Sequence, residues 1–233
     1  MKPPPTPPRT ALLAGASGFV GSRLLKLLLD SGDYERVHAV SRRPLPLDHA
    51  RLANHILPLE QSAQRLKGLR CDDAFCCLGT TRRIAGSDEA ARKVDVDLVL
   101  AFARTARACG ARRFVVLSSV GAKAGSRHPY LRAKAEMEAG LADLGFESLD
   151  ILRPGLLLGW RREPRPLELA AAALMPLANL VLRGRFAAWR GIDAGAAAAA
   201  MLGAARSPRR GRVVHGAEQL LRLADAVRRP TIR

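Results

Sequence analysis

The feature that most constrains the fold is a regular alternation of short apolar runs with longer stretches of helical pattern. The short runs are rich in Val, Leu, Phe and Ala, which is typical of buried strands. Predicted strands occupy residues 10–15, 36–41, 54–60, 73–81, 112–120 and 148–155, and predicted helices cover about 18–30, 87–109 and 130–144. Because parallel strands need helical crossovers, this order predicts an α/β fold, a doubly wound parallel sheet with helices on both faces.

The length of the chain favours a single domain, since 233 residues can bury one large core but not two. Residues 1–9 are proline-rich and predict a disordered leader, and residues 10–233 form the predicted domain. Beyond about residue 156 the pattern weakens, and we expect a small C-terminal part there. Its signals are a weak strand at 185–189, an alanine-rich helix over 193–205, a strand at 211–216 and a short final helix.

A net charge of +17 and a pI near 11.2 raise the question of a polyanionic partner. The cations are mostly scattered arginines without a recognised binding module. Aromatic residues make up only 4% of the chain, which gives no stacking platform for bases. Nucleic-acid binding is therefore disfavoured and rests on charge alone.

The most apolar later segment, residues 167–182, is interrupted by Pro176. It is also shorter than the roughly 20 apolar residues that a spanning helix needs. We expect a buried or interfacial helix pair there and no membrane span. Contact with a membrane surface through this segment and the nearby Arg183 and Arg185 is the alternative.

The four cysteines, Cys71, Cys76, Cys77 and Cys109, lack the spacing of a zinc site, so no metal is predicted. Cys76 and Cys77 lie in the apolar run AFCCLG and fit a buried strand as reduced thiols. The N-terminal MKPPPTPPRT has no apolar signal region. Together these features predict a cytoplasmic protein.

Three evenly spaced glycines, Gly15, Gly18 and Gly21, lie between the first predicted strand and the first helix. In such a turn the first glycine accepts a positive φ, the second allows a pyrophosphate to approach the backbone, and the third allows close packing of helix on strand. Amide groups at the helix start would bind the diphosphate. The predicted dinucleotide contacts here are Gly15, Ala16, Ser17, Gly18, Phe19, Val20 and Gly21.

The end of the second predicted strand indicates which nicotinamide cofactor is bound. No acidic residue is present to bind a ribose 2′-hydroxyl. Instead Ser41, Arg42 and Arg43 follow the strand, as a site for a 2′-phosphate requires. NADP (NADPH) is therefore favoured over NAD. At the end of the fourth strand Leu78, Gly79 and Thr80 are further predicted cofactor contacts.

Tyr130 and Lys134 are four residues apart, which places both side chains on one face of a helix. A neighbouring ammonium favours the phenolate, so this pair is a candidate for proton transfer. Ser118 and Ser119 end the preceding strand, where a hydroxyl can hold a substrate carbonyl or alcohol.

This succession of a glycine turn, a serine after the fifth strand and YxxxK in the next helix resembles the short-chain dehydrogenase/reductase family, from Thr10 to about Gly159. GASGFVG, SSVGAKAGSRHPYLRAK and ILRPG look most like its atypical Tat-interacting-protein-like branch, which is related to NAD-dependent epimerase/dehydratases. The resemblance implies a Rossmann-type core, with NADP(H) on the glycine loop and a small C-terminal part on the substrate side. The site residues it implies are the catalytic pair Tyr130 and Lys134, the assisting hydroxyl of Ser119 (Ser118 as second choice), and Arg153, Pro154 and Gly155 beside the nicotinamide.

Two features depart from the family pattern. Asp95 stands where many relatives carry an asparagine that steadies a proton relay, and the tail after Gly159 is short for a sugar epimerase. Our leading hypothesis is an NADP-dependent oxidoreductase acting on a small carbonyl or alcohol. The alternative is a non-catalytic NADPH-binding sensor or scaffold that acts through a protein partner.

Overall fold

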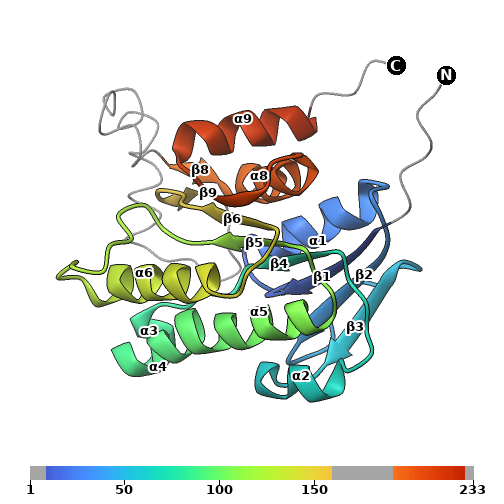
Figure 1. The fold of residues 1–233 in the computed structure, drawn as a ribbon, viewed down its shortest axis with the longest axis horizontal. Coiled ribbons are helices and arrows are strands. Elements are labelled where there is room, and N and C mark those ends of the chain that lie inside the picture. Colours follow the sequence, from blue (N-terminus) through green and yellow to red (C-terminus); the bar gives the residue numbers. More distant parts are fainter. Residues whose placement is uncertain (1–8, 159–190, 229–233) are drawn as a thin grey trace.

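The computed structural model describes residues 9–158 and 191–228 (Figure 1). Within these ranges seven strands form one sheet, in the order β3-β2-β1-β4-β5-β6-β9, and every neighbouring pair is parallel. The strands are β1 Arg9–Ala14, β2 Tyr34–Ser41, β3 Leu52–Ile56, β4 Asp73–Cys76, β5 Arg113–Leu117, β6 Ser148–Leu152 and β9 Gly211–His215. The predicted doubly wound parallel sheet of Rossmann type is confirmed.

Helices cover both faces of the sheet (Figure 1). One face carries α1 Gly21–Asp30 and α8 Ala194–Arg206, with α9 Ala217–Arg228 packed outside α8. The other face carries α5 Val99–Ala108 and α6 Pro129–Ala142, with the short α2 Ser62–Arg65, α3 Arg82–Ala85 and α4 Asp88–Arg92 beside them. The remaining elements are the single turn η1 Leu59–Gln61, the π-helical turn η2 Lys93–Leu98 and a two-stranded pair of β7 Leu157–Leu158 with β8 Ile192–Asp193.

Alternate residues along each strand feed two separate apolar cores. In β1, Ala11 and Leu13 face α1 and α8, whereas Leu12 and Ala14 face α5 and α6. All four side chains are fully buried. A strand covered on both faces must be apolar throughout, which is why these runs do not alternate with polar residues.

The order of the strands reverses at β1, because the chain moves from β1 to β2 and β3 on one side and then to β4 on the other. The loops after β1 and β4 therefore lie side by side at the carboxyl edge of the sheet and lead to helices on opposite faces. Ligands of open α/β sheets bind at such a point. The glycine turn follows β1 at this edge.

Several predicted boundaries differ from the observed ones. Helix α1 begins at Gly21 and not near Gly18, because the preceding residues complete the turn. The predicted helix 87–109 is interrupted by η2. The strand at 211–216 is β9, which completes the main sheet. The predicted domain limits, 1–9 and 10–233, stay predictions.

The alanine-rich segment is helical, as predicted, and forms α8. Asp193 caps the helix, since its Oδ1 accepts hydrogen bonds from the backbone N–H groups of Gly195 and Ala196 at 2.8 and 3.1 Å. Small side chains allow α8 to lie between the sheet and α9; a Cβ at Gly203 would be only 2.5 Å from the Leu223 carbonyl oxygen.

No helix in the described part of the chain is long and apolar enough to cross a membrane. The predicted helix pair at 167–182, with the neighbouring Arg183 and Arg185, and the weak strand at 185–189 lie outside the described residues.

Candidate active site

The turn between β1 and α1 needs glycine at its two ends. Gly15 has φ +83°, and a Cβ there would lie 2.7 Å from the backbone carbon of Cys77. A Cβ at Gly21 would lie 2.0 Å from the Gly15 carbonyl oxygen. Gly18 is different, because it is exposed and a Cβ there would be 3.1 Å from that oxygen. Gly15 and Gly21 thus shape the turn, and Gly18 leaves backbone open to a ligand.

The other residues of the turn divide in the same way. Ala16 and Val20 are buried in the core under α1, so their backbone alone is left for a ligand. Ser17 is exposed beside Gly18. Phe19 is partly buried, and its ring lies 4.7 Å from the guanidinium carbon of Arg23. The open surface of the turn is therefore its middle, at the N-terminus of a ten-residue helix.

The three residues predicted to select the cofactor have two different environments. Ser41 is buried, and its Oγ donates to the Arg43 carbonyl at 2.7 Å and lies 2.8 Å from the side-chain amide of Asn54. Its hydroxyl therefore holds the loop together. Arg42 and Arg43 are both exposed where β2 ends, at the same edge of the sheet as the glycine turn.

Lys134 is buried on α6, and its Nζ lies 2.6 Å from Oδ1 of the equally buried Asp95. Burial by itself would lower the pKa of Lys134, but the charge of Asp95, followed by that of Tyr130, outweighs it and raises the pKa. The other Asp95 oxygen accepts the Thr80 backbone N–H at 3.3 Å. A Cβ at Gly79 would lie 3.4 Å from Asp95 Oδ1 and 3.8 Å from Lys134 Nζ. A charged ammonium is thus held directly behind the loop that follows β4.

Asp95 lies within η2, where the helix widens by one residue before α5 begins. Single π-turns occur frequently at functional sites. In the sequence Asp95 stood out only as a departure from an asparagine, and its pairing with Lys134 was not predicted. A signal was present, since an acid inside the apolar segment 94–100 must find a cation if it is buried.

Tyr130 lies in the first turn of α6 and is 39% exposed, unlike Lys134 one turn later. Lys134 Nζ is 5.7 Å from the centre of the Tyr130 ring, which places both residues on one face of the helix. Tyr130, Thr80 and Asp95 line a cavity of about 830 Å³ between α6 and the α3–α4 segment. Leu78, partly buried, precedes this loop.

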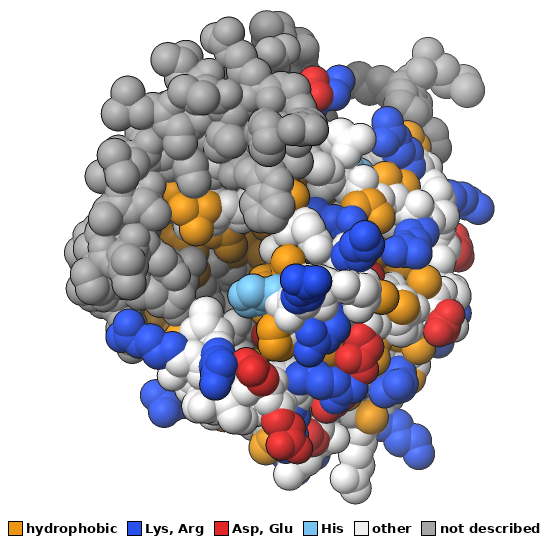
Figure 2. All heavy atoms as spheres, turned by 90° about the vertical axis from the view of Figure 1, so that its left-hand side faces the viewer, with side chains coloured by type: hydrophobic (Ala, Val, Ile, Leu, Met, Phe, Trp, Pro, Cys, Tyr) orange, Lys and Arg blue, Asp and Glu red, His pale blue; other side chains and the backbone are white. Residues whose placement is uncertain are grey.

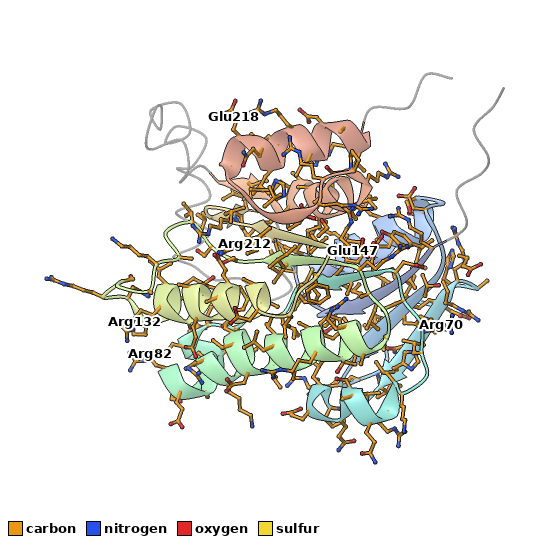
Figure 3. All side chains as sticks on the ribbon, in the orientation of Figure 1. Arg70, Arg82, Arg132, Glu147, Arg212 and Glu218 are labelled. Atoms are coloured by element: carbon orange, nitrogen blue, oxygen red, sulfur yellow. The ribbon has the colours of Figure 1, made fainter. Side chains whose placement is uncertain are left out.

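Charged side chains surround the cavity at this end of the molecule. Arg82 and Arg132 line it and extend from the same side, as Figure 3 shows. On the face in Figure 2, Lys and Arg side chains are interspersed with Asp and Glu. Arg82 lies 3.6 Å from Asp88, and Arg92 pairs with Glu136. Positive and negative side chains therefore both surround the exposed Tyr130 phenol in this cavity.

The two candidate serines differ. The Ser118 hydroxyl is buried and donates to Glu138 Oε1 at 2.5 Å. The partly exposed Ser119 hydroxyl donates to the neighbouring Val120 carbonyl at 3.2 Å, a bond that it can exchange for a ligand. Of the two hydroxyls, that of Ser119 is the more accessible.

Glu138 also fixes the loop after β6. Arg153 donates to both of its carboxylate oxygens, from Nε at 2.9 Å and from Nη2 at 2.5 Å. Pro154 is buried, and its carbonyl accepts the Val120 N–H at 2.9 Å. Gly155 follows, partly exposed. The loop after β6 is thus joined to the serine loop at two points, by Glu138 between Arg153 and Ser118 and by the bond from Val120 to Pro154. Glu138 was not among the residues predicted from the sequence. A sequence signal for Glu138 was available, because it lies four residues after Lys134 and therefore on the same face of the helix.

In the described part of the chain, no group of three or more His, Cys, Asp or Glu side chains could hold a metal ion. The residues present do fit a dinucleotide. They provide open backbone at a helix start beside the point where the strand order reverses, exposed arginines at the end of β2 and a buried ammonium.

Comparison with known proteins agrees with this geometry. Residues 11–161 match the family described as the NAD dependent epimerase/dehydratase family. The chain is 38% identical to Protein FMP52, mitochondrial, of Eremothecium gossypii over 181 residues, covering 78% of this chain and 80% of the relative. It is 39% identical to Protein HTATIP2 of Rattus norvegicus over 164 residues, covering 69% and 67%. The structure of MoeE5 in complex with UDP-glucose and NAD is similar in fold, with TM-score 0.64 and 20% identity over 94% of this chain and 81% of that one.

The expected cytoplasmic location is wrong. Several fungal relatives carry the word mitochondrial in their names. The prediction rested on reduced cysteines and on a missing signal region, and neither feature distinguishes the cytoplasm from the mitochondrial interior.

Proposed function

Because this chain belongs to the NAD dependent epimerase/dehydratase family, within the extended short-chain dehydrogenase/reductases, we propose that it is an NADP-dependent oxidoreductase acting on a small carbonyl or alcohol. The observation that carries the proposal is the buried Lys134–Asp95 ion pair, one helical turn from a phenol exposed on a cavity wall. We place the chain in the Tat-interacting-protein-like branch, on its similarity to Protein HTATIP2. From the names of its fungal relatives we also infer a mitochondrial location.

The cofactor would be held by the middle of the glycine turn, at Ser17 and Gly18, where backbone faces solvent. Arg42 and Arg43 would bind the 2′-phosphate, because a guanidinium forms paired hydrogen bonds with phosphate oxygens. The loop at Gly79 and Thr80 would line the cofactor site toward the nicotinamide. When bound, the nicotinamide supplies or accepts the hydride.

The side chains of this chain would handle the proton. Tyr130 exchanges a proton with the substrate oxygen, since its phenol is exposed on the cavity wall and its ring centre lies 5.7 Å from Lys134 Nζ. Lys134 provides positive charge beside the phenol and donors for the ribose, and Asp95 keeps that ammonium in place. Ser119 positions the substrate oxygen. We assign Ser118 a structural role, because its hydroxyl is already bonded to Glu138.

The test is Tyr130→Phe, assayed over a panel of small aldehydes, ketones and alcohols with NADPH or NADP. We expect turnover to fall about 10²- to 10⁴-fold, because the proton donor is lost. Affinity for NADPH, measured by fluorescence titration, should stay nearly unchanged. The matched control is Tyr34→Phe, which removes the hydroxyl that donates to Asp73 in the core at 2.8 Å. It should lose about 1–2 kcal/mol of unfolding free energy and retain turnover. Equal turnover by Tyr130→Phe and wild type would remove Tyr130 from the mechanism.

The second candidate is an NADPH-binding sensor or scaffold. This hypothesis is supported by the names of relatives such as FMP52 and HTATIP2, which state no reaction. It predicts tight NADPH binding and no turnover of any aldehyde, ketone or alcohol in the panel. Turnover that depends on Tyr130 would exclude it.

A further inference from the structure

Two cysteines meet at the edge of the sheet that is remote from the candidate active site. Cys71 lies in the loop that enters β4, and Cys109 ends α5 just before β5. Both are free and buried, with exposed fractions of 4% and 5%. The glycine turn and the Thr80 loop follow the other ends of the strands. Arg70, next to Cys71, accordingly lies at the opposite end of the molecule from Arg82 and Arg132 (Figure 3).

The geometry brings these two thiols together. The Cys71 backbone N–H donates to the Cys109 carbonyl at 2.9 Å. Chain segments joined in this way run about 5 Å apart, within the span of about 4.4–6.8 Å between the Cα atoms of a disulfide. Each sulfur also reaches into the segment that carries the other. Cys71 Sγ is 3.9 Å from the Ala106 carbonyl, and Cys109 Sγ is 3.7 Å from the Leu66 carbonyl.

The surroundings distinguish the two thiols. Each thiol acts on the other, which lowers the pKa of Cys109 and raises that of Cys71, so Cys109 is the better nucleophile. Both residues line a cavity of about 600 Å³, together with Arg70 and Arg112. The cavity gives a small reagent access. Its two exposed arginines outnumber the one acid of the lining, Asp72, which favours an anionic reagent.

We propose that Cys71 and Cys109 form a reversible disulfide when the protein meets an anionic low-molecular-weight disulfide. The Cys109 thiolate attacks one sulfur of the reagent, which breaks its S–S bond and releases one thiol. The Cys71 thiol then gives up its proton and attacks the Cys109 sulfur of the mixed disulfide, releasing the second thiol. The protein loses two hydrogens and two electrons, and the reagent is reduced to two thiols.

This site is separate from the proposed oxidoreductase activity and does not depend on it. Cys76 and Cys77 were predicted from the sequence to be reduced core residues, and this interpretation suits Cys76, because burial raises the pKa of its thiol to about 12. The bridge would tie the loop before β4 to the end of α5. Closing a long loop restricts the unfolded chain, so the oxidised protein should unfold at a higher temperature.

The experiment incubates the full-length protein with oxidised glutathione and then counts free thiols after denaturation. Wild type should lose two of its four thiols, and its mass should fall by two hydrogen atoms without retained glutathione. Cys71→Ala should form no bridge and should keep a glutathione adduct on Cys109. The matched control is Cys77→Ala, whose thiol lies 3.5 Å from Met201 on the other face of the sheet; it should form the bridge as wild type does.

Three results would overturn the proposal. They are retention of all four thiols by wild type, a lasting glutathione adduct on wild type, or bridge formation in Cys71→Ala. If Cys71→Ala fails to fold, Cys109→Ala provides the same test, because the bridge needs both sulfurs. Reduction of the bridged protein with dithiothreitol should restore the thiols and the original melting temperature.

Discussion

Two exposed arginines at the end of β2 determine the choice of cofactor in our proposal. Replacing Arg42 and Arg43 with Ala removes the charge that faces a 2′-phosphate. We expect the Kd for NADPH to rise about tenfold or more, since hydrogen bonds to charged groups contribute about 1.5–3 kcal/mol. The Kd for NADH should change little. Fluorescence titration with both cofactors measures this.

The control for this experiment is Arg104→Ala, which removes an equally exposed guanidinium from α5. It lowers the net charge without touching the β2 edge, so both Kd values should stay near wild type. Unchanged discrimination in the double variant would show that NADP preference, if present, arises elsewhere.

His38 makes the free energy of unfolding depend on pH. Its Nδ1 lies 2.9 Å from Nε2 of His55 on β3. Burial, followed by the charges of His55 and Arg36, lowers the pKa of His38 to about 4. An unfolded histidine takes up a proton near pH 6.5. As the pH falls from about 6.5 to about 4, the unfolded state therefore binds more protons, and the free energy of unfolding falls; above about 6.5 the contribution is fully present.

His38→Asn should reduce this pH dependence, measured by urea unfolding between pH 7 and pH 4. The exposed His128 provides the control, and His128→Asn should leave the curve unchanged. A curve for His38→Asn parallel to that of wild type would contradict the assignment. His55, whose pKa burial also lowers, accounts for the dependence that remains.

Among the elements, α6 does most to assemble the site. Its first turn carries Tyr130, its second Lys134 and its third Glu138. Glu138 connects the helix to the ends of β5 and β6 through Ser118 and Arg153. Arg212 on β9 lies 3.7 Å from the same carboxylate. One buried carboxylate therefore orients the helix, the serine loop and the loop after β6.

Glu138→Gln should lower the free energy of unfolding by about 3 kcal/mol, because a buried pair that loses one charge leaves the other uncompensated. Glu136→Gln is the control, two residues earlier on the same helix. Its carboxylate is exposed and pairs with Arg92, so the loss should stay below about 1 kcal/mol. Equal losses in urea unfolding would show that Glu138 contributes no more than a surface ion pair.

Across the whole molecule, charge is distributed unevenly between interior and surface. In the described part of the chain each buried acid contacts a cation or a histidine: Asp73 contacts Arg9, Asp95 contacts Lys134, Glu138 contacts Arg153 and Asp150 contacts His215. The chain has 38 Lys and Arg against 21 acidic residues, and among the described residues Lys134 is the one cation that is buried. On the face in Figure 2 the cations are still mixed with acids.

Much of this architecture could be predicted from local pattern. The alternation of apolar runs determined the parallel sheet, and the glycine spacing located the turn after β1, because Gly15 and Gly21 leave no room for a Cβ. The spacing of Tyr130 and Lys134 determined that they share a helix face. Periodicity and the backbone conformation of a tight turn depend on neighbours in the chain, so they can be predicted from sequence.

The tertiary structure alone decided which distant residues complete the site. The Asp95–Lys134 pair, the choice between Ser118 and Ser119, and the meeting of Cys71 with Cys109 all join segments far apart in the chain. Each depends on β4, β5 and β6 being neighbours in the sheet, which brings the segments flanking these strands together. The strength of such pairings comes from burial and from distances of a few ångströms, and only the folded chain sets these.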